Sequence, residues 1–310
     1  MKSFAEREKT CEMMYEMRGP YWHVYTSGKE TPVLFATKED LSFVMNVVAQ
    51  AALEFRPTYG RNDFQTSGVV IIAFEVMNNH LHFILSGSKE DILAFFAFIK
   101  RRLSRTIRDA RCLEANLKSI DNLVSLRNNI VYVNRNGYVA DPNYTPFNYP
   151  WGTGRFYFND IPTHTRYSDL KLTPKRQMFR GRAPELPGDW AILDGYVAPS
   201  SYCSIQFGMG VFRDAHHYFN QLGKNVEAYQ ELAQEFGDAD FLTDAELMAK
   251  VISMARDGYK VSSLRDLSKA QKCDLARTLH YDFRSSNGQI RRILGLNQYE
   301  VDSLFPLSAG

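Results

Sequence analysis

Apolar and polar positions follow strand and helix spacings in turn along the first hundred residues. Residues 20–26 are mainly aromatic and β-branched and predict a first strand. Thr37 and Asp40 form a capping box, so we expect a helix that begins there and continues to about Phe55. Residues 56–67 are rich in Pro, Gly, Asn and Ser and predict a loop.

Two apolar strands are expected next. Residues 69–77 predict a buried strand, and a turn at residues 78–79 sends the chain back through residues 80–85. Ser88 and Asp91 then mark the start of a second amphipathic helix. The order strand, helix, strand, strand, helix favours an α+β fold with an antiparallel sheet of the ferredoxin-like kind.

A third helix is predicted after a segment without a strand pattern. Residues 112–120 are interpreted as helix or loop, and Asp121 is expected to cap a helix that ends at Gly137. Its apolar stripe has spacings of three, four and three residues and consists of Leu123, Leu126, Ile130 and Val133. Its polar face carries Ser125, Asn128, Asn129, Tyr132 and Asn136. Tyr132 and Asn136 lie one turn apart and are neighbours on that face.

The C-terminal half is basic and irregular at first and then helical. Residues 160–195 show no clear periodicity, and residues 196–260 are mostly helical, with an apolar stripe made of Phe219, Leu222, Val226 and Tyr229. Residues 261–310 predict three short helices, over 269–280, 289–294 and 298–305. Two short helices joined by a turn that contains glycine are typical of a helix-turn-helix module, which makes this region a candidate DNA-binding domain.

Composition adds that the chain is an ordinary globular one. It has 310 residues with a net charge of +2, and no apolar run approaches the length of a membrane span. The N-terminus lacks an apolar signal core. Its four cysteines are far apart in the sequence, which argues against a zinc ribbon or a disulfide framework. These features predict a protein of a reducing cytoplasm, without a membrane partner.

Positive charge is concentrated in two short segments. The first holds Lys100, Arg101, Arg102, Arg105, Arg108 and Arg111, and the second holds Lys171, Lys175, Arg176, Arg180 and Arg182. A local cluster of cations matters more for binding a polyanion than the total charge does. We therefore expect Lys100, Arg101, Arg105 and Arg108 to contact nucleic acid. Arg291 and Arg292 are further candidates if the last helices form a recognition module.

The most informative residues are His80 and His82, which lie two positions apart on a predicted strand. Both imidazoles therefore point to the same face and can hold a divalent metal. Tyr132 and Asn136 offer a nucleophile and a further ligand on one helix. Two imidazole nitrogens and one amide oxygen suit Mg²⁺ or Mn²⁺, and such a set is what metal-assisted phosphoryl transfer to a tyrosine needs.

Several segments together resemble the HUH single-strand DNA transposases, which comprise the IS200-like and the REP-associated tyrosine transposases. Residues 77–85, Met-Asn-Asn-His-Leu-His-Phe-Ile-Leu, look like the metal-binding strand of that family. Residues 132–136, Tyr-Val-Asn-Arg-Asn, look like its nucleophile segment, and Tyr149-Pro150-Trp151 resembles the motif that follows. Residues 21–24 and 34–35 resemble the first strand and the entry to the first helix. Family members often have proline where this chain has Gly137.

The resemblance covers residues 18–158 and implies both a fold and a reaction. It implies an RRM-like core that cleaves single-stranded, hairpin-bearing DNA through a 5′-phosphotyrosine link. Tyr132 would be the nucleophile, and His80, His82 and Asn136 would be ligands of Mg²⁺ or Mn²⁺. It also implies a prokaryotic, nucleoid-associated enzyme of DNA transposition and recombination, either a homodimer or a monomer.

Four parts of the chain are expected on this basis. They are a lead-in over 1–19, the catalytic domain over 20–159, a basic linker and helical extension over 160–260, and the candidate helix-turn-helix over 261–310. Two other functions stay open. One is a domesticated DNA-binding protein or regulator without catalysis. The other is an unrelated metal hydrolase, in which Glu75 would supply a carboxylate near the histidines.

Three other conspicuous side chains are expected to be structural. Trp151 could stack on a base but more often would pack. His23 could approach the site but is interpreted as a satisfied strand histidine. His216 and His217 are adjacent on a predicted helix and diverge by about 100°, so they do not form a pair.

Overall fold

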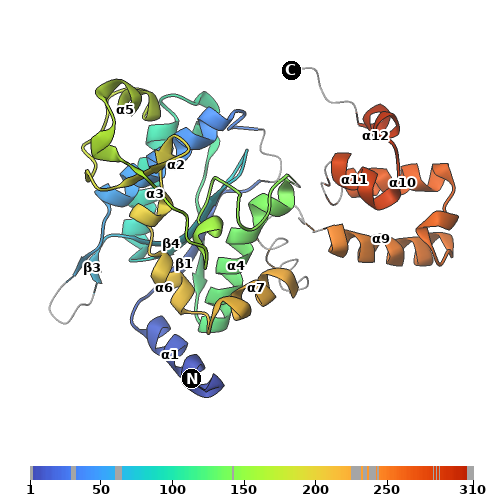
Figure 1. The fold of residues 1–310 in the computed structure, drawn as a ribbon, viewed down its shortest axis with the longest axis horizontal. Coiled ribbons are helices and arrows are strands. Elements are labelled where there is room, and N and C mark those ends of the chain that lie inside the picture. The colour runs from blue at the N-terminus through green and yellow to red at the C-terminus, as the bar shows by residue number, and fades with distance from the viewer. Residues whose placement is uncertain are drawn as a thin grey trace. The chain divides into compact units, whose positions relative to one another are not determined.

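The computed structural model describes residues 3–28, 33–59, 65–141, 143–224, 232, 236, 242, 244–281, 283, 285 and 287–305. The chain divides into two compact units. The first consists of Met1–Gly137 and Pro146–Asn225, and the second of Tyr138–Thr145 and Val226–Gly310. Figure 1 shows both units as ribbons. The first unit contains every residue expected to take part in catalysis, and the second contains the candidate helix-turn-helix.

The centre of the first unit is a four-stranded antiparallel sheet with the order β4-β5-β1-β6. Its strands are β1 (Tyr21–Tyr25), β4 (Val70–Val76), β5 (Leu81–Ser86) and β6 (Asn116–Ile120). Helix α2 (Lys38–Glu54) follows β1, and α3 (Lys89–Leu103) follows β5. The sequence of elements is therefore β-α-β-β-α-β, and the predicted α+β class with an antiparallel sheet is confirmed.

Strand β6 lies where the sequence suggested helix or loop, so that interpretation of residues 112–120 is wrong for 116–120. After the short helix η2 (Arg108–Cys112), β6 pairs with β1 from Tyr21 opposite Ile120 to Tyr25 opposite Asn116. Ile120 is the only buried residue of this edge strand. An edge strand that is half exposed shows little apolar alternation, which explains why the pattern did not reveal it.

The two faces of the sheet carry different chemistry. Side chains alternate along β5, so Phe83 lies on one face and His82 on the other. Phe83 packs edge-on against Phe95 of α3, with ring centroids 5.9 Å apart. The face of His82 is covered by helix α4 (Leu123–Ala140), whose Tyr132 ring lies against it. The apolar face thus anchors the sheet, and the other face holds the histidines.

Helix α4 begins one residue later and ends three residues later than expected. The Asn122 side chain caps it by accepting the Ser125 N–H at 2.8 Å, so the predicted cap at Asp121 is wrong. Gly137 does not end the helix, which continues to Ala140. A Cβ at position 137 would overlap Glu75 Oε1 and the Tyr149 ring. Glycine is required here by close packing, not by helix termination.

The outer edge of β4 is covered by the aromatic segment that follows α4. The Val76 N–H donates to the Trp151 carbonyl at 2.8 Å, and the Thr153 N–H donates to the Phe74 carbonyl at 2.9 Å. Trp151 is buried, as expected for a packing residue, and the short helix η3 (Gly154–Phe156) follows. These bonds satisfy backbone groups that an exposed edge strand would leave open.

Smaller elements extend the first unit. A short hairpin of β2 (Thr58–Tyr59) and β3 (Gln65–Ser67) occupies part of the predicted loop. After residue 160 come β7 (Thr165–Arg166), η4 (Tyr167–Asp169), α5 (Leu172–Met178), β8 (Ala191–Leu193), β9 (Tyr196–Val197), η5 (Pro199–Ser201), α6 (Ile205–Gly210) and α7 (Ala215–Lys224). Strand β9 is fastened to α2, because the Val197 N–H donates to Asn46 Oδ1 at 2.9 Å. The segment that begins at residue 160 therefore packs onto the first unit.

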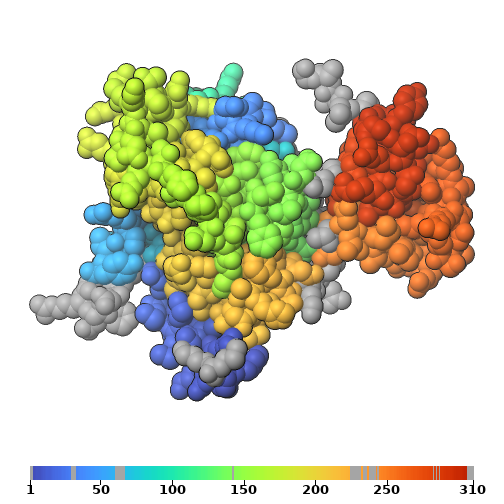
Figure 2. All heavy atoms as spheres, viewed as in Figure 1, coloured from blue at the N-terminus to red at the C-terminus, as the bar shows by residue number. Residues whose placement is uncertain are grey.

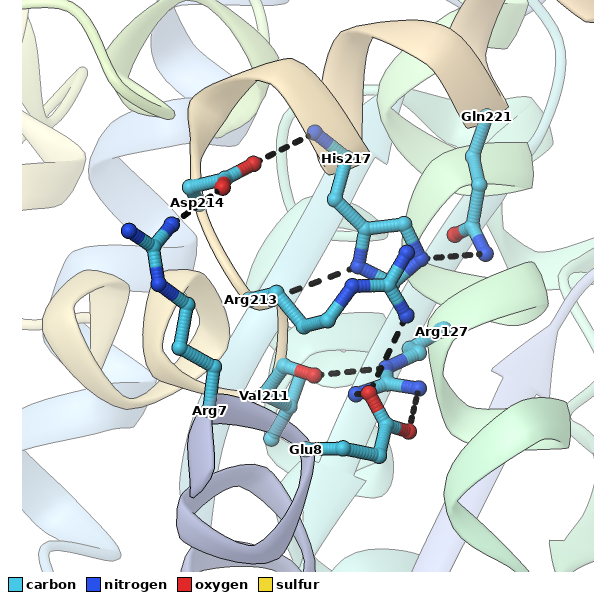
Figure 3. A network of polar contacts seen from close by, with 8 residues as sticks. All are labelled: Arg7, Glu8, Arg127, Val211, Arg213, Asp214, His217 and Gln221. Atoms are coloured by element: carbon cyan, nitrogen blue, oxygen red, sulfur yellow. Dashed lines mark hydrogen bonds and ion pairs between the residues drawn. The ribbon is translucent and has the colours of Figure 1, made fainter. Parts of the chain in front are cut away.

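The N-terminal lead-in is an ordered helix, α1 (Phe4–Glu16), next to the segment 205–224 (Figure 2). Glu8 accepts hydrogen bonds from Arg127 of α4 at 2.6 and 3.2 Å and from Arg213 at 3.1 Å (Figure 3). His217 accepts the Arg213 N–H, so it is structural, as expected. Burial, together with the positive charges of Arg213 and Arg127, lowers the pKa of His217 to about 4.

The second unit is helical. It contains α9 (Asp244–Tyr259), η6 (Leu264–Asp266), α10 (Lys269–Tyr281), α11 (Asn287–Leu294) and α12 (Gln298–Leu304). Leu247, Leu275, Ile290 and Val301 meet in its core. The three predicted short helices are thus confirmed as helices, whereas their function as a helix-turn-helix stays a prediction. Val226 and Tyr229 of the predicted apolar stripe lie outside the described residues. No helix in the described part of the chain is long and apolar enough to cross a membrane.

Candidate functional site

Three aromatic side chains expected to form the site meet on the α4 face of the sheet. The ring centroids of His80 and His82 are 4.9 Å apart, and the Tyr132 ring lies 5.7 Å from that of His82. His23 of β1 joins them, with its ring 5.3 Å from His82 and 6.0 Å from Tyr132. Strand alternation places His82 and His23 on one face, and the helix above it supplies the tyrosine.

Asn136 follows Tyr132 by one turn of α4. The backbone next to it is fixed, since the Gly137 N–H donates to Glu75 Oε1 at 2.7 Å and Glu75 lies directly opposite His82 in the β4–β5 pairing. The Asn136 Nδ2 is buried and has no hydrogen-bond partner among the described residues. A buried amide without a partner is uncommon and often marks a functional position.

The site is closed. The exposed fraction is 3% for His80, 0% for His82, 3% for Tyr132 and 4% for Asn136. The backbone at Gly28 lies directly against His80, because a Cβ at that position would be 2.7 Å from His80 Nδ1. A substrate therefore reaches these side chains only if atoms that cover them move.

A chain of hydrogen bonds fixes the tautomer of His82. The Asn129 Nδ2 donates to the Ser125 carbonyl at 2.8 Å, so Asn129 Oδ1 is the acceptor that faces His23 Nδ1 at 2.7 Å. His23 therefore carries its proton on Nδ1. Because His23 is fully buried, we take its ring as neutral, with Nε2 as acceptor. His82 Nδ1 lies 3.0 Å from that Nε2 and must donate to it.

His80 is fixed in the same way by its neighbour in the sequence. The Asn79 Nδ2 donates to the Gly28 carbonyl at 3.0 Å, which leaves Asn79 Oδ1 to accept from His80 Nδ1 at 2.6 Å. In both histidines Nδ1 carries the proton, and Nε2 is the basic nitrogen. This is the form in which imidazole binds a metal, with the second nitrogen held by a neighbour.

The metal expected from the sequence stays a prediction. In the described part of the chain, no three or more His, Cys, Asp or Glu side chains form a metal-binding group. The further protein ligand expected from the sequence is the amide oxygen of Asn136, which lies on α4 one turn after Tyr132. Two imidazoles and an amide, without thiolate, suit Mg²⁺ or Mn²⁺ better than structural zinc.

Glu75 has a structural part in this arrangement. It is fully buried, and burial raises its pKa well above the ordinary value, against the lowering effect of the Gly137 N–H. The alternative of a metal hydrolase needs Glu75 to complete a ligand group with the histidines. No such group exists among the described residues. Glu75 instead joins β4 to α4 beside Asn136.

Two residues at the site were not among the predicted site residues. His23 is a satisfied strand histidine as expected, but one of its partners is His82. Asn129 was placed only on the polar face of its helix. Its spacing contained a signal, because Asn129, Tyr132 and Asn136 are separated by three and four residues and therefore share one face.

The predicted cations of the first cluster lie at the C-terminal end of α3 and in η2. Arg101, Arg105 and Arg108 are exposed and Lys100 is half-buried, whereas Arg102 is held by Gln50. Helix α3 packs on the apolar face of the sheet. It returns the chain from the Ser86 end of β5 to Asn116 at the start of β6, and Asn116 is in register with Tyr25 and His82. The cations thus lie at the His82 end of the sheet, on the opposite face.

Arg291 and Arg292 lie on α11 of the second unit, and both are exposed. Arg292 pairs with Asp244 at 2.7 Å, and Arg291 donates to the Gln298 side chain. Arg292 is thus partly neutralised by its own unit.

Comparison with known proteins gives one structural likeness. No family model and no curated protein matches the sequence. The chain is similar to the solved structure of a REP-associated tyrosine transposase bound to a REP hairpin, with a TM-score of 0.34 and 12% sequence identity. The likeness covers 57% of this chain and 94% of that one.

Proposed function

We propose that this protein is a transposase-like endonuclease and strand transferase that acts on single-stranded DNA through Tyr132. The observation that carries the proposal is the position of the Tyr132 ring, 5.7 Å from His82 and 6.0 Å from His23, on the helix that also bears Asn136. A phenol beside a pair of metal-competent imidazoles has the composition of a site for phosphoryl transfer to tyrosine.

In the reaction, the Tyr132 oxygen gives up its proton and forms a bond to phosphorus of a phosphodiester. The bond from phosphorus to the 3′-oxygen breaks, and this oxygen takes up a proton, so that no net proton is released. The products are a 5′-phosphotyrosine link and a free 3′-hydroxyl, and attack by a 3′-hydroxyl on that link reverses the step and joins strands. A phenol with a free pKa of about 10 is a poor nucleophile at neutral pH, so alignment matters. Helix α4 supplies that alignment.

His80, His82 and Asn136 would hold Mg²⁺ or Mn²⁺. The metal would supply Lewis-acid polarisation of the scissile phosphate. Hydrogen bonds from Nδ1 to Asn79 and to His23 would leave Nε2 of His80 and His82 as the metal-binding nitrogens. The β-α-β-β-α-β sheet would correspond to the RRM-like core of the HUH transposases.

DNA contacts outside the site are assigned to the two regions predicted from the sequence. Lys100, Arg101, Arg105 and Arg108 would contact phosphates of the single strand, with an affinity that falls as salt rises. Helices α10 to α12, with Arg291 and Arg292, would act as a helix-turn-helix on a hairpin stem. A homodimer is compatible with both roles.

The second candidate is a DNA-binding protein or regulator without catalysis. The observation that favours it is the closure of the site, because Tyr132 is only 3% exposed. In that case the same scaffold would bind DNA while the tyrosine serves in packing.

The test uses end-labelled hairpin oligonucleotides from the DNA that flanks the gene, incubated with protein and analysed on a denaturing gel. Wild type is compared with Tyr132→Phe, with Mn²⁺ or with EDTA. Tyr218→Phe is the matched control, because Tyr218 is equally buried in the first unit but bonds Asn134. We expect an adduct with wild type and with Tyr218→Phe in Mn²⁺ only, and none with Tyr132→Phe. Binding without any adduct in all three proteins would favour the regulator.

A further inference from the structure

We propose that His23 and Asn129 are positioning residues that set the tautomer and ring orientation of His82, so that its Nε2 is ready for the metal. The inference rests on the proposed function for the identity of the ligand. It does not rest on it for the tautomer, which follows from the hydrogen bonds together with the neutral state of the fully buried His23 ring. Neither residue is proposed to contact DNA or metal.

The chain of bonds has a fixed direction. It begins at the Ser125 carbonyl, which accepts from the Asn129 amide nitrogen at 2.8 Å and thereby turns Asn129 Oδ1 toward His23. His23 Nδ1 donates to that oxygen at 2.7 Å, and His82 Nδ1 donates to His23 Nε2 at 3.0 Å. Each donor determines the next, so the backbone of α4 sets the protonation pattern of a strand residue.

The elements involved make the chain rigid. His23 lies on β1 between β5 and β6, Asn129 lies on α4, and both are buried to 1% exposure or less. Tyr132 follows Asn129 by three residues on the same helical face. The helix that carries the nucleophile therefore also orients the histidine beneath it, which couples the two halves of the site.

Substitutions at His23 separate hydrogen bonding from packing. His23→Gln can still accept from His82 Nδ1 through its amide oxygen and donate to Asn129 through its amide nitrogen. His23→Leu has similar bulk but removes the hydrogen bonds of His23 to His82 Nδ1 and to Asn129 Oδ1. His217→Gln is the matched control, because it removes a histidine that is bonded within another network of the same unit.

The first experiment determines the tautomer of His82 in the absence of metal. Long-range ¹H–¹⁵N correlation spectra of the metal-free full-length protein, with His82→Gln to assign the signals, report which ring nitrogen of His82 carries hydrogen. We expect the Nδ1–H form in wild type, His217→Gln and His23→Gln, and a mixture of tautomers in His23→Leu. An Nε2–H form of His82 in the wild-type protein would overturn the inference.

The second experiment measures Mn²⁺ binding by titration calorimetry, on variants whose circular dichroism spectra match that of wild type. Loss of an outer partner typically weakens metal binding about 10- to 100-fold. We expect a weakening of that size for His23→Leu and Asn129→Leu, and less than about threefold for His23→Gln. If all His23 and Asn129 variants bound Mn²⁺ as tightly as wild type while His80→Ala lost binding, only the positioning role would be overturned. No binding to wild type, with the Nδ1–H form present in the spectra, would overturn the metal site of the proposed function instead.

Discussion

At the scale of single residues, two groups of histidines matter, namely His23, His80 and His82 at the site, and His217 in the hydrogen-bond network next to the N-terminal helix. His217 belongs to the second group, and its pKa is lowered to about 4 by burial and by the charges of Arg213 and Arg127. The folded protein thus keeps His217 neutral down to about pH 4, whereas the unfolded chain protonates it near 6.5. Between these values the unfolded state binds more protons, so stability falls as the pH is lowered.

Replacing His217 removes this dependence. We expect wild type to lose stability relative to His217→Gln as the pH falls from about 6.5 to about 4. Urea unfolding followed by circular dichroism at pH 4.5, 5.5 and 7 measures it. His216→Gln is the control, because His216 is exposed on the same helix. A difference that stays constant across this range would contradict the assignment.

Single residues were also where the sequence was most informative about chemistry. Spacing alone placed His80 with His82, and Tyr132 with Asn136, because strand and helix periods determine which side chains share a face. Spacing could not join the two pairs or add His23, because contacts between β1, β5 and α4 depend on how the chain closes over long separations. The roles of these residues as ligands and nucleophile stay predictions.

At the scale of elements, α4 is the helix on which the site depends, and Gly137 is its tightest point. We expect Gly137→Ala to destabilise the protein by about 1–3 kcal/mol, the range for overpacking, because its Cβ would overlap Glu75 and the Tyr149 ring. Thermal and urea unfolding measure the effect.

Gly223→Ala on α7 is the matched control, since a Cβ there meets nothing within 4 Å. It should be neutral or more stable by up to about 1 kcal/mol, the helix propensity of alanine over glycine. If Gly137→Ala were as stable as Gly223→Ala, the close packing of Glu75 against α4 would be wrong.

Elements with a strong local signal were predicted well. The capping box at Thr37 and Asp40 is present, with α2 beginning at Lys38. By contrast, β6 and the small sheet of β7, β8 and β9 were missed, because strands of two to five residues are held by their neighbours more than by their own pattern. The predicted helix end at Gly137 was wrong for a related reason. Local rules associate glycine with helix ends, whereas this glycine is required by the Glu75 carboxylate packed against it.

At the scale of the whole molecule, the net charge of +2 does not indicate DNA binding, but the clustering of the cations does. We expect the combined variant Arg101→Gln, Arg105→Gln and Arg108→Gln to bind single-stranded DNA more weakly. Its plot of log affinity against log salt should be shallower by up to about 2, at about 0.7 per lost contact to a single strand. Fluorescence anisotropy with a labelled oligonucleotide, at salt concentrations from about 50 to about 300 mM, measures both the affinity and the slope.

The control carries Lys171→Gln, Arg176→Gln and Arg182→Gln, which remove the same charge from exposed positions of the second basic segment. This control should change the slope less. Equal changes in both variants would mean that the charge of the unit as a whole, and not the end of α3, attracts the strand.

If Tyr132 is the nucleophile, it becomes covalently linked to DNA, and peptide mapping locates the linkage. Wild-type protein is incubated with the hairpin oligonucleotide and Mn²⁺, treated with nuclease and protease, and analysed by mass spectrometry. We expect a nucleotide phosphate on the peptide that contains Tyr132, absent when Mn²⁺ is replaced by EDTA or when His82 is changed to Ala. A linkage at another tyrosine, or DNA that binds and stays intact without any linkage, would contradict it.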